Sequence, residues 1–180
     1  MEKTDNRNSL PKWMKLDTRP MDKGRFGKYG YGYTRPVGKR ELWRPATRYI
    51  KYNPGKFGGI KEITLKPNTY FVSDHGRIYS TTSGLLKKSK KHRRKLTRLY
   101  DSEGKFVYVR PYRLCLDNWL EPPKCHRSVV RHLLRTCNHK NGKYWDDRLD
   151  NIEYASRAAN TQHEFEVLNM GERRKNPKQG

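Results

Sequence analysis

Four side chains in the last third of the chain have types that could take part in hydrolysis. They are Asn138, His139, Asn151 and Asn160, and Asn151 follows His139 by twelve residues and precedes Asn160 by nine. An imidazole with an ordinary pKa of about 6.5 can accept a proton at physiological pH, which suits general-base catalysis. Carboxamides can hydrogen-bond to an imidazole or offer an oxygen to a hard cation. His163, one helical turn beyond Asn160, is a further candidate for binding a cation or a phosphate. Because most histidines at such positions are simply exposed helix residues, that assignment stays open.

Short elements must position these side chains. Residues 151–155 read as a short strand, and Ser156 can cap a helix that runs to about Met170 with Gly171 as its stop. The expected order is therefore strand, loop, strand, helix. Upstream, residues 113–120 have helical spacing and end before a Pro-Pro pair, which indicates a packing helix. Residues 70–73, 77–80 and 105–110 alternate like strands and predict an antiparallel meander.

The stretch from Cys137 to His163 resembles the HNH motif of phage and intron-encoded homing endonucleases. In that family an Asx-His pair is followed by a glycine turn, by an Asn that opens a strand with an aliphatic, an acidic and an aromatic residue, and by an Asn on the next helix. The matching residues here are Asn138-His139, Gly142, Asn151-Ile152-Glu153-Tyr154 and Asn160. Without the resemblance, the same stretch would read as a turn-rich loop followed by a capped helix, with His139 in a structural role.

The resemblance implies a ββα-metal module with one divalent cation, Mg²⁺ or Mn²⁺. His139 would act as the general base, and Asn151 would accept a hydrogen bond from its other ring nitrogen. Asn138 and Asn160 would be the metal ligands, each through its amide oxygen. Many members of the family carry Asp where this chain has Asn138. A neutral ligand attracts a cation less strongly, so the metal half of the site is the weaker half of this prediction.

A second resemblance lies upstream, in residues 70–80. Their sequence resembles the Tyr-x-Val-Ser-x-x-Gly-Arg-Ile-x-Ser element that commonly precedes HNH modules and serves DNA binding. The resemblance makes Arg77 available for a phosphate, and we assign nucleic-acid binding also to Arg148 and Arg157. Together the two resemblances cover roughly residues 62 to 165.

The charge of the chain points to the same class of partner. Its 41 Lys and Arg against 18 Asp and Glu leave a formal charge of +23, which favours a polyanion. A basic run between the predicted strands is expected to form a loop that grips phosphates, although a run of like charge alone names no ligand. Its members are Lys87, Lys88, Lys90, Lys91, Arg93, Arg94 and Lys95. No long apolar run or basic amphipathic helix is evident, so we predict no membrane partner.

Residues 1–60 are predicted to form a long, irregular, basic extension rather than a domain. They mix Lys and Arg with Gly, Pro and Tyr, most densely in residues 24–36, and show no sustained period. Their aromatic side chains could stack on unpaired bases, or the segment could be a flexible tail with nonspecific affinity. The predicted fold is α+β, with this extension, a β-rich nucleic-acid-binding module at 61–111, the HNH module at 112–171 and a basic tail at 172–180.

The cysteines and the N-terminus indicate an intracellular protein in a reducing compartment, either the cytoplasm of a phage-infected bacterium or an organellar matrix. Cys115, Cys125 and Cys137 are an odd set without CxxC spacing, and the first residues have no apolar stretch typical of a secretory signal. A zinc site formed by Cys125, His126, His132 and Cys137 is conceivable, but the spacing matches no standard site and zinc is not expected.

Two functions from different classes follow. The first is a metal-dependent DNA endonuclease of the HNH homing type that hydrolyses phosphodiester bonds in duplex DNA. The alternative is a structural nucleic-acid-binding protein, for example in an organellar ribosome or another ribonucleoprotein, that uses an inactive HNH fold and binds RNA. The alternative depends on residues 24–36, because Gly/Tyr/Arg segments are typical of tails threaded through folded RNA.

Overall fold

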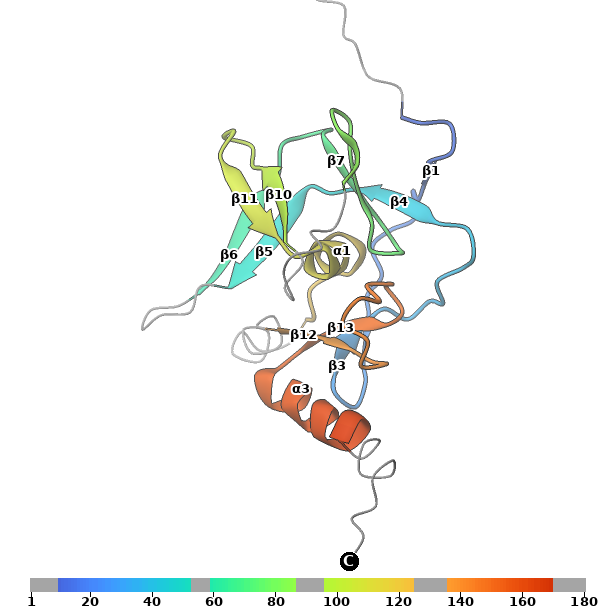
Figure 1. The fold of residues 1–180 in the computed structure, drawn as a ribbon, viewed down its shortest axis with the longest axis vertical. Coiled ribbons are helices and arrows are strands. Elements are labelled where there is room, and N and C mark those ends of the chain that lie inside the picture. Colours follow the sequence, from blue (N-terminus) through green and yellow to red (C-terminus); the bar gives the residue numbers. More distant parts are fainter. Residues whose placement is uncertain (1–9, 53–58, 87–95, 125–135, 170–180) are drawn as a thin grey trace, which may run out of the picture.

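Short strands are the commonest regular elements of the structure, a computed structural model that describes residues 10–52, 59–86, 96–124 and 136–169 (Figure 1). The described residues form a mixed α+β fold with many strands and few helices. The expected fold class is therefore confirmed at this level. In the described part of the chain, no helix has the length and apolar character needed to cross a membrane.

One sheet contains the hairpin predicted from residues 70–80. Strands β7 (Tyr70–Ser73) and β8 (Ile78–Ser80) pair antiparallel, and the turn between them places Gly76 at a φ of 73°. The sheet has the order β1-β4-β7-β8-β9. Its other members are β1 (Lys15–Leu16), β4 (Leu42–Pro45) and β9 (Gly84–Leu86).

The strand expected at 105–110 is present as β11 (Phe106–Val109), but it does not join this sheet. It pairs with β10 (Thr97–Tyr100) in a separate hairpin, so the prediction of one meander is wrong. A second hairpin, β5 (Arg48–Tyr52) with β6 (Ile60–Thr64), continues into it through the Leu65–Asp101 bridge. The apolar faces of these strands pack against α1, and this packing separates β11 from the sheet that contains β8.

Helix α1 (Pro111–Trp119) is the central element of the core. It lies between the two hairpins on one side and β12 and β13 on the other (Figure 1). The buried Asp117 carboxylate accepts hydrogen bonds from the Ile50 backbone N–H at 2.7 Å and from the Tyr154 hydroxyl at 2.6 Å. One helix residue therefore joins the N-terminal half of the chain to the C-terminal module.

The C-terminal elements follow the predicted order of strand, loop, strand and helix. Strands β12 (Thr136–His139) and β13 (Ile152–Ala155) pair antiparallel and are followed by α3 (Arg157–His163). The Ser156 hydroxyl caps this helix by accepting a hydrogen bond from the Ala159 N–H at 3.1 Å. From Glu164 to Asn169 the helix widens into a π-helix, η1. The expected end at Met170 and Gly171 lies outside the described residues.

Residues 10–52 are not an irregular extension, and that prediction is corrected. Strand β3 (Gly30–Gly32) pairs with β13, and with β2 (Arg25–Phe26) it completes a sheet of order β12-β13-β3-β2. A Cβ on Gly30 would overlap the Tyr154 carbonyl oxygen, so the glycine allows this close approach. Both strands are too short to give a period, and the partner of β3 is more than a hundred residues away in sequence.

The predicted boundaries at residues 60 and 111 do not divide the core. One buried cluster contains Tyr31, Tyr49, Leu99, Leu114 and Tyr154, which come from all three predicted segments. Burial of these side chains therefore depends on the segments folding together. The predicted tail at 172–180 lies outside the described residues.

Candidate active site

His139 lies at the end of β12 with one ring nitrogen held by a carboxylate. Its Nε2 is 3.0 Å from Oδ1 of Asp147, and only 11% of the His139 side chain and 2% of the Asp147 side chain are exposed. The Tyr112 ring packs edge-on against the imidazole, with centroids 5.3 Å apart. Burial raises the pKa of Tyr112 to about 12, so this neighbour stays uncharged near neutral pH. A carboxylate on one ring nitrogen fixes the tautomer and aims the other nitrogen.

The predicted hydrogen bond from His139 to Asn151 is replaced by the bond to Asp147. Asn151 is buried, and its amide instead binds the loop between the two strands. Its Oδ1 accepts from the Asn141 N–H at 3.0 Å, and its Nδ2 donates to Asn141 Oδ1 at 3.0 Å and to the Asp146 carbonyl at 2.7 Å. Asn151 therefore shapes the loop immediately before Asp147.

Asp147 also packs against the turn of the upstream hairpin. A Cβ built on Gly76 would lie 2.5 Å from both the Cβ and the carbonyl oxygen of Asp147. The Leu149 N–H donates to the Asp74 carbonyl at 2.8 Å, next to this contact. The upstream hairpin thus supports the loop that holds the partner of His139.

This contact predicts that Gly76→Ala is more destabilising than Gly84→Ala. Both glycines have a positive φ, 73° and 71°, at which an alanine costs about 1–2 kcal/mol. Only Gly76 faces Asp147, while a Cβ on Gly84 would have no atom within 4 Å. Overpacking should add about 1–3 kcal/mol at Gly76. Equal losses in urea unfolding would contradict the contact.

Asn138 is buried beside a carboxylate on the neighbouring strand. Its Nδ2 donates to Oε1 of Glu153 at 2.8 Å, and the two residues are 3% and 4% exposed. Asn160 is partly buried on α3. Its backbone N–H donates to the Ser156 carbonyl at 3.0 Å. The amide oxygens of Asn138 and Asn160 and the carboxylate of Glu153 are all hard donors, which suits Mg²⁺ or Mn²⁺ in kind. Among the described residues, no group of three or more His, Cys, Asp and Glu side chains could hold an ion.

The conceivable zinc site falls largely outside the described residues, which include neither Cys125 nor His126 nor His132. The thiol of Cys137 is described, and the Arg113 guanidinium lies 3.6 Å from its sulfur. Burial raises the pKa of Cys137, which favours the neutral thiol over the thiolate that zinc binds.

His163 is buried rather than exposed, which corrects the reading of it as an ordinary surface histidine. It is 3% exposed, its Nε2 lies 3.0 Å from the Lys140 carbonyl, and its ring packs against Tyr29 with centroids 4.7 Å apart. If Nε2 donates to that carbonyl, His163 fastens the end of α3 to the end of β12. With these contacts, His163 has a packing role.

The β2–β3 hairpin closes one side of the site. Lys28 Nζ lies 2.7 Å from Oε2 of Glu166, and the Tyr29 hydroxyl donates to the same oxygen. The hydrogen bond from Lys28, followed by those from Tyr29 and Gln162, lowers the pKa of Glu166 to about 2. A cavity of about 490 Å³ lies between this hairpin and the module. Its walls include Lys28, Tyr29, Lys140, Glu153 and His163.

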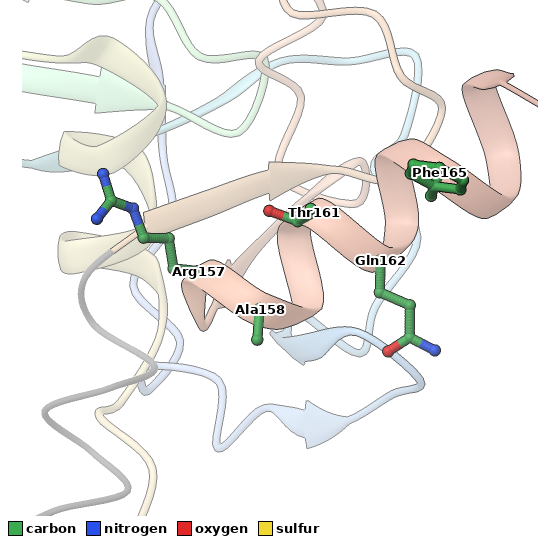
Figure 2. A pocket seen from close by; sticks show the side chains of 5 residues that line it. All are labelled: Arg157, Ala158, Thr161, Gln162 and Phe165. Carbon is green, nitrogen blue, oxygen red and sulfur yellow. The ribbon is translucent and has the colours of Figure 1, made fainter.

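The predicted phosphate-binding residues divide into three groups. Arg77 is exposed but ion-paired with Glu41, and Arg148 is exposed but paired with Asp150 at 2.9 Å. Arg157 is exposed at the start of α3, where it lines an open pocket of about 540 Å³ with Ala158, Thr161, Gln162 and Phe165 (Figure 2). The basic run Lys87 to Lys95 lies outside the described residues.

Sequence reasoning missed Asp147 and Glu153. The sequence does contain a signal for Asp147, which is the second residue of an Asp-Asp pair and follows His139 by eight residues. The pair lies in the loop between two antiparallel strands, and such a loop returns close to the end of the first strand. For Glu153 it was the register of an antiparallel pair, which sets the acid opposite Asn138. Both signals require the strands to be aligned first.

Comparisons with known proteins found a similar solved structure. No protein-family model and no curated protein matches the sequence. The chain is similar to a structure described as "DNA binding and cleavage by the HNH homing endonuclease I-HmuI", with a TM-score of 0.43 and 19% sequence identity. The similarity covers 61% of this chain, and the chain spans 60% of the length of that one.

Proposed function

We propose that this chain is a metal-dependent DNA endonuclease of the HNH homing type and that His139 is its general base. The observation that carries the proposal is the His139 Nε2 to Asp147 Oδ1 contact of 3.0 Å at the end of β12. It occurs within a β12–β13–α3 arrangement whose sequence resembles the HNH motif. A positioned imidazole and hard oxygen donors in one small module suit phosphodiester hydrolysis.

In this proposal the imidazole takes a proton from the attacking water. Asp147 accepts the Nε2–H, so Nδ1 has the lone pair that receives that proton. The carboxylate then stabilises the imidazolium that forms, as the acid does in other His-carboxylate pairs. Asn151 is a positioning residue that acts through the loop before Asp147, and Gly76 supports that loop from the upstream hairpin.

Asn138 and Asn160 would hold the divalent cation through their amide oxygens, with water and phosphate oxygens as its other ligands. When bound, the cation would stabilise negative charge on the scissile phosphate and on the leaving oxygen. Glu153 would bring to this set the negative charge that Asn138 lacks, because its carboxylate is within hydrogen-bond distance of the Asn138 amide.

Duplex DNA is the proposed partner, held by the excess of positive charge in the chain. Arg157 extends from the start of α3, while Arg77 and Arg148 would exchange or share their carboxylate partners with phosphates. Binding should weaken steeply with salt, because each phosphate contact releases a counterion.

Two measurements test the metal half of the proposal. The chain should nick supercoiled plasmid in Mg²⁺ or Mn²⁺ and not in EDTA. Calorimetric titration with Mn²⁺ should give an affinity that Glu153→Gln lowers by about 10- to 100-fold, the usual effect of losing a residue that supports a metal ligand. Glu62→Gln, an exposed glutamate on β6, is the control and should change neither result. Cleavage in EDTA, or Mn²⁺ affinity independent of Glu153, would contradict this half.

The structural-protein alternative loses the observation that favoured it. Residues 24–36 include the β2–β3 hairpin, which pairs with β13. Tyr31 is 4% exposed, and Tyr29 is bound to Glu166 and His163. The Gly/Tyr pattern is therefore accounted for by packing within the chain.

A further inference from the structure

The β10–β11 hairpin presents three aromatic rings to solvent on one face. Along these strands exposed and covered residues alternate, and the register sets Arg98 opposite Tyr108 and Tyr100 opposite Phe106. Tyr100 is 42% exposed, Phe106 59% and Tyr108 56%. Directly opposite residues of an antiparallel pair share a face, so these four side chains form one surface, here called the aromatic platform.

The aromatic platform is not needed for the core. Leu99 and Val109, on the other face of the same strands, are fully buried and belong to the main core cluster. That face anchors the hairpin, so the exposed rings are presented on a fixed support. The rings of Phe106 and Tyr108 pack edge to face with centroids 5.8 Å apart. Exposed aromatics on a rigid strand pair are a usual means of binding rather than of folding.

Basic side chains lie next to the rings. Arg98 is exposed within the aromatic platform, and the exposed Lys66 is adjacent because its backbone N–H donates to the Tyr100 carbonyl at 3.1 Å. Lys105 precedes Phe106, and its exposed ammonium is paired with the exposed Glu103 carboxylate at 2.7 Å, a surface pair that a phosphate could replace. A neutral apolar partner would gain nothing from these basic side chains. A nucleic acid would, because its bases can stack on the rings while its phosphates pair with the basic residues.

We propose that the aromatic platform binds unpaired bases of single-stranded DNA. Phe106 and Tyr108 are two residues apart on one strand, a separation of about 6.6–6.8 Å, so unpaired bases of one extended strand can reach both rings. Arg98, directly opposite Tyr108 in the register, would pair with a phosphate of that strand. This site goes beyond the proposed nuclease activity, because β10 and β11 lie on the other side of α1 from β12 and β13 (Figure 1).

The test measures DNA binding by the full chain in EDTA, so its result does not depend on cleavage. Fluorescence anisotropy gives Kd for a labelled oligothymidine of about 16 nucleotides and for a duplex of mixed sequence. The double variant Phe106→Ala, Tyr108→Ala should raise Kd for the single strand by about tenfold or more, since each stacked base contributes that much. Kd for the duplex should change by less than about twofold, and the slope of log Kd against log salt should stay the same.

Two controls keep the result specific. The ring-preserving double variant Phe106→Tyr, Tyr108→Phe should bind the single strand like the wild type. Trp13→Ala removes a ring that is 54% exposed near β1 and should leave single-strand binding unchanged. Thermal unfolding checks that all variants are folded.

Four outcomes would overturn the proposal. They are unchanged single-strand binding in the alanine variant, an equal loss on the duplex, a loss confined to an oligouridine RNA measured in parallel, and a loss of the same size in Trp13→Ala. The RNA outcome would assign the aromatic platform to RNA. The Trp13 outcome would mean that the effect follows from any exposed ring.

Discussion

Replacing His139 with alanine should abolish DNA cleavage while leaving DNA binding intact. A positioned general base contributes about a hundredfold to ten-thousandfold to a rate, and removal of the imidazole leaves Asp147 with no group through which to act. The phosphate-binding residues Arg77, Arg148 and Arg157 are untouched by the change. Plasmid nicking in Mg²⁺ measures the first effect, and anisotropy with duplex DNA measures the second.

His75→Ala is the matched control for the loss of a histidine. This residue is on the upstream turn, and its Nε2 lies 3.1 Å from the Gly38 carbonyl rather than in contact with His139 or Asp147 in any hydrogen bond. It should retain most of the nicking activity. Because the Asp147 side chain is only 2% exposed, the unfolding of His139→Ala must be measured as well. Equal nicking by folded His139→Ala and the wild type would exclude His139 as the base.

Replacing Asp147 with asparagine should lower the rate of cleavage by about 10- to 100-fold without changing the KM for DNA. The shape of the side chain is preserved, but an amide nitrogen can donate to Nε2 of His139. The ring proton would then move to Nδ1, and the imidazole could no longer accept a proton from water there. A two-bond proton–nitrogen NMR spectrum reports which ring nitrogen carries the hydrogen.

Asp146→Asn removes the same charge one residue away. The Asp146 carboxylate accepts a hydrogen bond from Asn141 Nδ2 at 2.7 Å, a contact that an asparagine can keep through its oxygen. This variant should keep the wild-type tautomer of His139 and lose much less activity. Loss of similar size in both variants would mean that loop charge, rather than the Asp147 contact, is what matters.

Elements with local signals were predicted well. Residues 70–73 form β7 as expected, since alternation and a glycine turn are sufficient to specify a hairpin. The cap by Ser156 and the termination of α1 before Pro122 likewise depend on neighbouring residues in the sequence. The strand expected at 151–155 is present one residue shorter, as β13.

Residues 10–52 were mispredicted because their structure depends on distant partners. Strand β3 is three residues long and pairs with β13, more than a hundred residues later. Nothing near Tyr31 in the sequence indicates that its ring enters the core. Glycines within residues 24–36 suggest an irregular chain, whereas Gly30 permits close strand approach. Glycine-rich and aromatic composition alone does not separate these two cases.

The candidate site was predicted in its position but not in its hydrogen bonds. The spacing of the motif correctly predicted that His139, Asn151 and the start of α3 belong to one module. The choice between Asn151 and Asp147 as the partner of His139 depends on how a twelve-residue loop folds back, which spacing leaves undetermined. The upstream contact at Gly76 adds a third segment that no local pattern contains.

The most direct test of the central claim is a crystal structure of the chain with duplex DNA and Mn²⁺, in which the cation is located by its anomalous scattering. We expect an anomalous peak between the amide oxygens of Asn138 and Asn160, with the scissile phosphate facing Nδ1 of His139. A DNA backbone that runs elsewhere on the molecule, with no cation bound by Asn138, would contradict it.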